Sequence, residues 1–260
     1  LFFFDAHIRS LVLDEARLEN LRYFNVKRVL TTAYSPGDVD TAEQLLSYFE
    51  NLLTNELHRL RTAGLEAYLA IGVHPDAVPR RTHYELWNEL PVLLKERSVV
   101  ALGELALTES QTSEVILSKQ LEIAEQVDKP VVICFDGNER VRQVKRVLSL
   151  AAEVNFPPDR MLLNHIDFTS LRVAMEAGAW AGVTVNPLDL SAPEACELVR
   201  RYGEDALKHV IFNSGARSGV GDVLALPKAA LELSSAGFSP AHVRRLTWGN
   251  ANRFFQVPLT

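Results

Sequence analysis

The sequence has few cysteines, no excess of positive charge and no long apolar run. Its 260 residues include two cysteines, Cys134 and Cys196, a number and spacing that exclude a disulfide framework and a zinc ribbon. Lys and Arg number 27 against 33 Asp and Glu, so the net charge of −6 disfavours nucleic acid as a partner. No segment reaches the roughly 20 apolar residues of a membrane-spanning helix. We therefore expect a cytoplasmic globular protein without a membrane span.

The sequence also lacks internal boundaries. No low-complexity linker or shift in composition divides it, so we expect one domain over residues 1–260. No Gly-x-Gly-x-x-Gly follows the first apolar segment, which argues against a dinucleotide-binding fold.

Short apolar segments alternate with longer amphipathic segments throughout the chain. The short segments are apolar at consecutive positions, as expected for strands of a parallel sheet that is buried on both faces. The expected strands are 2–6, 28–33, 67–72, 99–103, 131–134, 161–164, 181–185 and 210–213. The expected helices are 42–62, 84–96, 114–127, 139–153, 169–177, 193–202, 222–236 and 240–255. Eight such units predict an α/β fold of the (β/α)8 TIM-barrel type, with an open doubly wound sheet as the alternative.

Four residues that commonly ligate metals lie near the carboxyl ends of expected strands: His7, His74, Glu104 and His165. A single histidine at such a place usually has a structural role. In a barrel, however, the carboxyl ends of all strands meet at one rim, where active sites are built. The four residues together therefore predict a functional site at the mouth of the barrel.

Several motifs extend this prediction along the chain. They are F-D-A-H (4–7), G-V-H-P (72–75), A-L-G-E-L (101–105), K-P-V-V-I (129–133), N-H-I-D (164–167), E-A-G-A-W-A-G-V-T-V-N-P (176–187) and F-N-S-G-A-R-S-G-V-G-D-V-L-A-L-P-K-A-A-L-E (212–232). In this order the motifs resemble the TatD-like metal-dependent hydrolases of the amidohydrolase superfamily.

The resemblance implies a (β/α)8 barrel that holds one or two divalent metals. In the family, a His-x-His pair on strand 1 and an aspartate on strand 8 serve the first metal. A glutamate on strand 4 bridges both metals, and histidines on strands 5 and 6 hold the second. His7 matches the first histidine of the pair, Glu104 the bridging glutamate and His165 the strand-6 histidine.

Three positions depart from the family pattern. Arg9 replaces the second histidine of strand 1, Cys134 stands at the strand-5 histidine, and Gly215 replaces the strand-8 aspartate. Arginine and glycine cannot ligate a cation, so we expect the first metal site to be lost. We also expect the Arg9 guanidinium to occupy that position and to hydrogen-bond Glu104, with Gly215 giving it room.

The second metal site remains open. Glu104, Cys134 and His165, with His7 beside them, form an oxygen, sulfur and nitrogen set that suits one divalent metal such as Zn²⁺. The alternative is a metal-free site in which Cys134 only fills the space of a histidine.

Two functions follow. The first is a hydrolase that acts on a phosphoester or similar bond with at most one divalent metal, with Glu104, His7 and His165 as catalytic residues. Its substrate would contact His74, Arg9 and Arg217 at the mouth. The second is a catalytically inactive relative, a pseudo-hydrolase, that binds a small anionic ligand or a protein partner, with Arg9 in place of the first metal and paired with Glu104.

Overall fold

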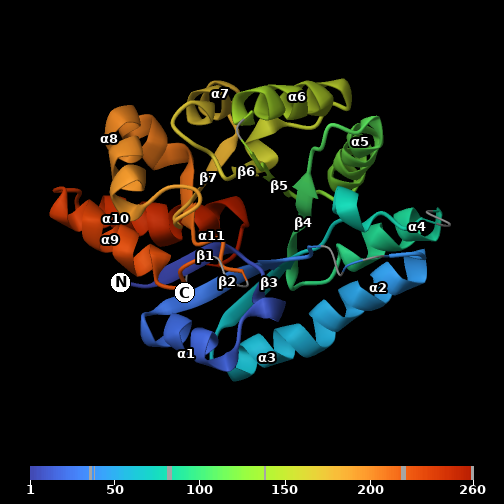
Figure 1. Cartoon of the computed structure of the whole chain (residues 1–260), viewed down its shortest axis with the longest axis horizontal. Helices are drawn as coiled ribbons and strands as arrows, with labels where there is room; N and C mark the ends of the chain where they lie inside the picture. Colours follow the sequence, from blue (N-terminus) through green and yellow to red (C-terminus); the bar gives the residue numbers. More distant parts are fainter. Residues whose placement is uncertain (35–36, 38, 81–83, 138, 218–220, 259–260) are drawn as a thin grey trace.

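The chain forms a nearly closed barrel of eight parallel strands (Figure 1). The computed structural model describes residues 1–34, 37, 39–80, 84–137, 139–217 and 221–258. The strands are β1 (Phe3–Ile8), β2 (Val26–Thr32), β3 (Glu66–Ala70), β4 (Val99–Ala106), β5 (Val131–Cys134), β6 (Met161–Asn164), β7 (Trp180–Thr184) and β8 (Val210–Asn213). They pair in chain order, and the segment after β8 returns to β1, where Arg9 N donates a 2.8 Å hydrogen bond to Ala216 O. The predicted (β/α)8 architecture is confirmed.

Helices surround the strands (Figure 1). They are α1 (Glu15–Tyr23), α2 (Ala42–Asn51), α3 (Leu57–Thr62), α4 (Tyr84–Leu93), α5 (Gln111–Gln126), α6 (Arg140–Glu153), α7 (Ser170–Glu176), α8 (Ala192–His209), α9 (Ala225–Ser235), α10 (Pro240–Arg244) and α11 (Asn250–Phe254). A π-helical turn at Leu52–Glu56 joins α2 to α3, and another at Arg245–Gly249 joins α10 to α11. Each of these pairs covers one helix expected from the sequence. Helix α1 was not among the expected helices, because its sequence is mostly polar and buries only Leu18 and Leu21.

The apolar strands form two packed layers of side chains. Between strands and helices lies the larger cluster, which explains why the outward face of each strand is apolar. Inside the barrel, Phe4, Leu30 and Val132 pack in a smaller cluster. Trp248 and Phe255 belong to the same cluster, so the C-terminal helices close the amino-terminal end of the barrel. The carboxyl end is left for polar side chains.

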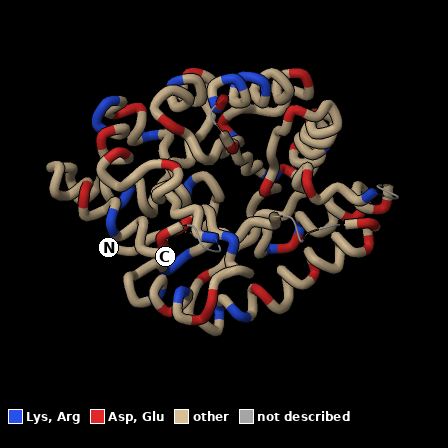
Figure 2. Tube along the Cα trace, in the orientation of Figure 1, with Lys and Arg blue, Asp and Glu red and all other residues tan. Residues whose placement is uncertain are grey.

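Charged residues of both signs are interspersed around the outer ring of helices (Figure 2). Among the described residues, no helix is long and apolar enough to cross a membrane. The cytoplasmic location and the single domain stay predictions.

Candidate functional site

Glu104 on β4 is the centre of one side of the barrel mouth. Its side chain is only 2 % exposed. Arg9 Nη2 donates a 2.7 Å hydrogen bond to Oε1, and Arg9 Nε lies 3.4 Å from Oε2. Oε2 also accepts a 2.9 Å hydrogen bond from Thr32 Oγ1 and lies 3.1 Å from His7 Nε2. Side chains of the barrel itself therefore satisfy both carboxylate oxygens, and the predicted pair of Arg9 with Glu104 is confirmed.

The charges of this side follow from burial and pairing. Burial by itself would raise the pKa of Glu104, but the hydrogen bond of His7, together with the charge and hydrogen bonds of Arg9, holds that pKa well below its usual range. Burial lowers the pKa of His7, so His7 is neutral at neutral pH and Arg9 is the permanent cation beside the carboxylate. A neutral His7 shares its Nε2 between Glu104 Oε2 and Cys134 Sγ, which is 3.8 Å away, while its Nδ1 is buried with no partner among the described residues.

The Arg9 guanidinium also packs against an aromatic ring. Its Cζ lies 3.4 Å from the centroid of the Tyr34 ring, and the Tyr34 and His74 rings are 4.8 Å apart. His74 Nδ1 accepts a hydrogen bond from Asp76 N at 3.2 Å, so His74 stabilises the turn after β3 and also borders the mouth next to Tyr34.

The expectation that Gly215 gives room to Arg9 stays a prediction, and the immediate neighbours of Gly215 are other residues. A Cβ added to Gly215 would lie 2.6 Å from Thr184 Cγ2 and 3.7 Å from His165 Cε1. Gly215 also has a φ of +57°, in the left-handed region that favours glycine. A side chain at this position would therefore press first against Thr184 and then against Asn186.

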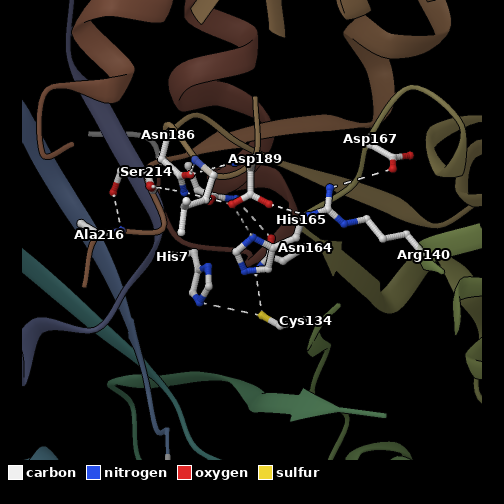
Figure 3. Close-up of polar contacts among 12 residues, drawn as sticks. His7, Cys134, Arg140, Asn164, His165, Asp167, Asn186, Asp189, Ser214 and Ala216 are labelled. Atoms are coloured by element: carbon white, nitrogen blue, oxygen red, sulfur yellow. Dashed lines mark hydrogen bonds and ion pairs between the residues drawn. The ribbon is translucent and has the colours of Figure 1, made fainter. Parts of the chain in front are cut away.

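The other side of the mouth gathers His7, Cys134 and His165 (Figure 3). One ligand atom from each residue lies within 4.8 Å of the others, and all three residues are buried. Cys134 ends β5 and His165 directly follows β6, so the parallel strands bring the two side by side. Burial and then the negative charge of Glu104 raise the pKa of Cys134, so the thiol is protonated at neutral pH.

Asp189 lies next to the Nδ1 side of the His165 ring and orients it (Figure 3). Its Oδ2 lies 3.2 Å from His165 Nδ1 and accepts a 3.0 Å hydrogen bond from Asn186 Nδ2. Arg140 Nη2 donates a 2.9 Å hydrogen bond to Asp189 Oδ1. Burial would raise the pKa of Asp189, but His165, Arg140 and Asn186 together lower it. Because Asp189 takes Nδ1, Nε2 is the ring nitrogen of His165 left for a ligand.

Asp5 is a second buried carboxylate, on β1 next to the site. Its Oδ1 accepts hydrogen bonds from Ser214 N at 2.9 Å and from His7 N at 3.4 Å. No cation pairs with it in the part of the chain that is described. Burial raises its pKa from 3.8 to about 6, since these hydrogen bonds only partly offset the loss of solvent.

Sequence reasoning missed three contributors, and the expected role of Arg217 stays a prediction. Thr32, Tyr34 and Asp189 were not singled out, although each follows or ends a strand at the same rim, the signal that identified His74. Arg217 was expected at the site, and its backbone oxygen accepts a 3.3 Å hydrogen bond from Arg17 Nη1. No described contact joins the Arg217 side chain to the site residues.

Comparison with known proteins agrees with this arrangement. Residues 4–207 match the family model described as TatD related DNase. The chain belongs to the TatD family. It is 27% identical over 257 residues to an uncharacterized metal-dependent hydrolase from Methanocaldococcus jannaschii, an alignment that covers 97% of this chain and 99% of the relative.

Solved structures share the fold of this chain. A TatD-like protein from Archaeoglobus fulgidus superposes with a TM-score of 0.81 at 24% identity, covering 98% of this chain and 100% of the other. The phosphotriesterase homology protein from Escherichia coli, solved with phosphate in its active site, has a TM-score of 0.75 at 15% identity, covering 98% and 99%.

The metal chemistry of the TatD family fits this site only in part. Two metals do not fit, because Arg9 brings a fixed positive charge to Glu104 and Gly215 offers no ligand. One divalent metal does fit the nitrogen and sulfur donors of His7, Cys134 and His165, a set that suits Zn²⁺. A histidine ligand whose other nitrogen meets a carboxylate, as His165 meets Asp189, is the usual support of such sites. Glu104, which the sequence placed among the ligands, is not one of the three mutually close groups.

Proposed function

We propose that this TatD-family protein hydrolyses a phosphoester or a similar bond at the barrel mouth with at most one divalent metal, held by His7, Cys134 and His165. The convergence of these three donors from β1, β5 and β6 within 4.8 Å carries the proposal. Zn²⁺ bound there with an open position would lower the pKa of a bound water and polarise the substrate.

The protein's own residues have distinct tasks in this proposal. Asp189 holds His165 so that Nε2 faces Cys134 and His7. Arg9 uses its Nε and one Nη2 N–H towards Glu104, and a guanidinium has five N–H groups. The remaining N–H groups, on a side chain that is 16 % exposed, would bind an anionic oxygen of the substrate at the mouth.

His7 has two alternative partners for its Nε2 atom, Glu104 and a metal. Its Nε2 contacts Glu104 Oε2 in the structure, yet the same nitrogen is the one near Cys134 Sγ. Binding a metal through Nε2 would require His7 to release Glu104, whose charge Arg9 and Thr32 would still neutralise and solvate. Glu104 would then act indirectly, by holding the Arg9 guanidinium in position through its hydrogen bonds.

The completed Arg9–Glu104 pair favours a second candidate function. Because this side of the mouth is electrostatically satisfied by the chain alone, the protein could be a metal-free pseudo-hydrolase that binds a small anion or a protein partner through Arg9 and His74. The two candidates differ in whether Cys134 ever ligates a metal.

Metal analysis of protein purified without a chelator or a histidine tag separates them. The hydrolase proposal predicts about one zinc per chain, retained in Cys196→Ser and largely lost in Cys134→Ser. Cys196 is the matched control, since it is the other buried cysteine and lies on α8. Replacing zinc with Co²⁺ should give a sulfur-to-metal charge-transfer band that is absent in Cys134→Ser.

Activity on a chromogenic phosphodiester, measured with added Zn²⁺ or Mn²⁺, completes the test. Metal content below about 0.1 per chain, with no hydrolysis above background, would overturn the hydrolase proposal and leave the anion-binding one.

A further inference from the structure

A large cavity lies at the amino-terminal end of the barrel, opposite the candidate site. Its volume is about 760 Å³, within the range of small-molecule sites. It lies at the amino ends of β2 to β5 and is bordered by the C-terminal segment after α11. Its lining residues include Arg61, Tyr68, Arg97, Lys129 and Phe255.

Three cations of the cavity converge on the short segment 97–99 that leads into β4. Arg97 belongs to this segment. Arg61 Nη2 donates a 2.8 Å hydrogen bond to Ser98 Oγ, and Lys129 Nζ donates a 2.6 Å hydrogen bond to Val99 O. The three side chains come from α3, from the loop after α4 and from the loop before β5. The fold therefore gathers positive charge from three separate parts of the chain.

The two acids of the lining are each paired with another arginine, and of the three cations only Lys129 is acted on by one of them, the adjacent Asp128. Glu66 is paired with the buried Arg28 at 2.7 Å, and Asp128 is paired with Arg160 at 3.3 Å. Within the described residues, no carboxylate contacts Arg61, Arg97 or Lys129, and the Arg97 guanidinium has no hydrogen-bond partner. Four cationic side chains line this cavity against two carboxylates, so it is a local excess of positive charge on a chain of net charge −6.

The rest of the lining is apolar or aromatic. Tyr68 and Phe255 contribute rings, and Val100, Val257 and Pro258 contribute aliphatic surface. Such a wall suits a flat, weakly polar body, whereas the guanidinium groups of Arg61 and Arg97 suit the paired oxygens of a phosphate. Burial also lowers the pKa of Lys129, a cost that a bound anion would relieve.

We propose that this cavity is a second ligand site, separate from the barrel mouth, and that it binds an organic phosphate of the nucleoside-diphosphate type. The phosphates contact Arg61, Arg97 and Lys129, and the ring system lies against Tyr68 and Phe255. The site is independent of the proposed hydrolase function, because it shares no residue with the mouth.

Calorimetric titration of the full chain with ADP in the presence of EDTA tests the site while any metal-dependent hydrolysis is suppressed. We expect saturable binding of one ADP per chain, with inorganic phosphate and adenosine each binding more weakly. Arg97→Glu should weaken ADP binding by about tenfold or more, because it replaces a charge-assisted contact with repulsion. Arg97→Ala is the milder second variant, and circular dichroism verifies that both fold.

Two matched variants locate the ligand. Lys145→Glu makes the same change of charge on an exposed residue of α6 and should leave ADP affinity within about twofold. Arg9→Met removes the cation of the mouth and should likewise have no effect on ADP.

Three results would overturn the proposal: no saturable binding at about 1 mM ADP, equal affinity in Arg97→Glu and the parent, or ADP no tighter than inorganic phosphate. Loss of ADP binding in an Arg9→Met variant that circular dichroism shows to be folded would also overturn it, since the anion would then belong to the mouth. None of these results bears on the metal content by which the hydrolase proposal is judged.

Discussion

The two sides of the barrel mouth treat buried polar groups in different ways. On the side of β1, β2 and β4, the carboxylate of Glu104 meets Arg9, Thr32 and His7, and every oxygen has a partner from the chain. On the side of β5, β6 and β7, Cys134 and His165 approach His7 without completing a set of strong hydrogen bonds. On the first side the cation Arg9 comes from the chain itself, whereas on the second side sulfur and nitrogen donor atoms face one another. His7 belongs to both sides.

Removing the internal cation should have the largest effect. Arg9→Met leaves Glu104 buried and without its permanent counter-charge, and we expect a loss of about 3–5 kcal/mol in the free energy of unfolding at pH 7. Urea denaturation measures this loss. Adding Glu104→Gln to Arg9→Met should recover part of it, because the double variant no longer buries a charge. A loss below about 1 kcal/mol in Arg9→Met would show that the pair does not complete this side.

Asp5 tests the same contrast through pH, because it is a buried carboxylate without a cation. Between pH 4 and its native pKa of about 6, the native state keeps a proton at Asp5 that the unfolded chain has released. The free energy of unfolding therefore falls as pH rises through this window. Asp5→Asn should remove that fall and stabilise the protein at pH 7 by about 2–3 kcal/mol.

Urea unfolding at several pH values between 4 and 7 measures the effect. Glu104 contributes in the opposite sense, since its lowered pKa gives stability that is present above the unfolded pKa near 4.3 and is lost as pH falls below it. If the free energy of unfolding of Asp5→Asn depends on pH as it does in the parent, the raised pKa of Asp5 is contradicted.

Asp189→Asn tests the side of the mouth that carries the donor atoms of Cys134 and His165. The amide keeps the size of the side chain but holds His165 less firmly, so we expect Zn²⁺ or Co²⁺ to bind about ten- to a hundredfold more weakly. Competition with a chromogenic chelator measures the metal affinity directly, without relying on turnover. Asp167→Asn is the control, because Asp167 contacts Arg140 at 3.9 Å but not His165. Equal weakening in both variants would point to Arg140 and not to orientation of His165.

The smallest effect is expected at Tyr34. Tyr34→Leu removes the ring on which the Arg9 guanidinium rests, at 3.4 Å, and should lower the free energy of unfolding by about 1 kcal/mol. The same substitution in the Arg9→Met background should cost clearly less if the ring acts through Arg9. Equal costs in both backgrounds would assign the effect to packing alone.

The fold was predictable from the sequence because continuous apolar segments identify buried parallel strands. The pair of Arg9 with Glu104 joins β1 to β4, which are not adjacent strands, and it was predictable only because the family resemblance places both residues at metal-ligand positions. The polar helix α1 and the loop residue Asp189 were not predicted, since neither has an apolar periodicity. The position of Gly215 against Thr184 depends on side chains from two strands that only the folded barrel brings together.

The close approach of Gly215 to Thr184 also limits which substitutions the site can accept. Restoring an aspartate at Gly215 would press a new Cβ against Thr184 at a backbone φ that disfavours side chains. Replacing Arg9 alone with histidine would remove the cation beside Glu104 without providing a metal ligand after β8. Each of these substitutions is thus expected to be harmful by itself, so a two-metal centre of the kind that the family resemblance implies could be built here only by changing several positions together.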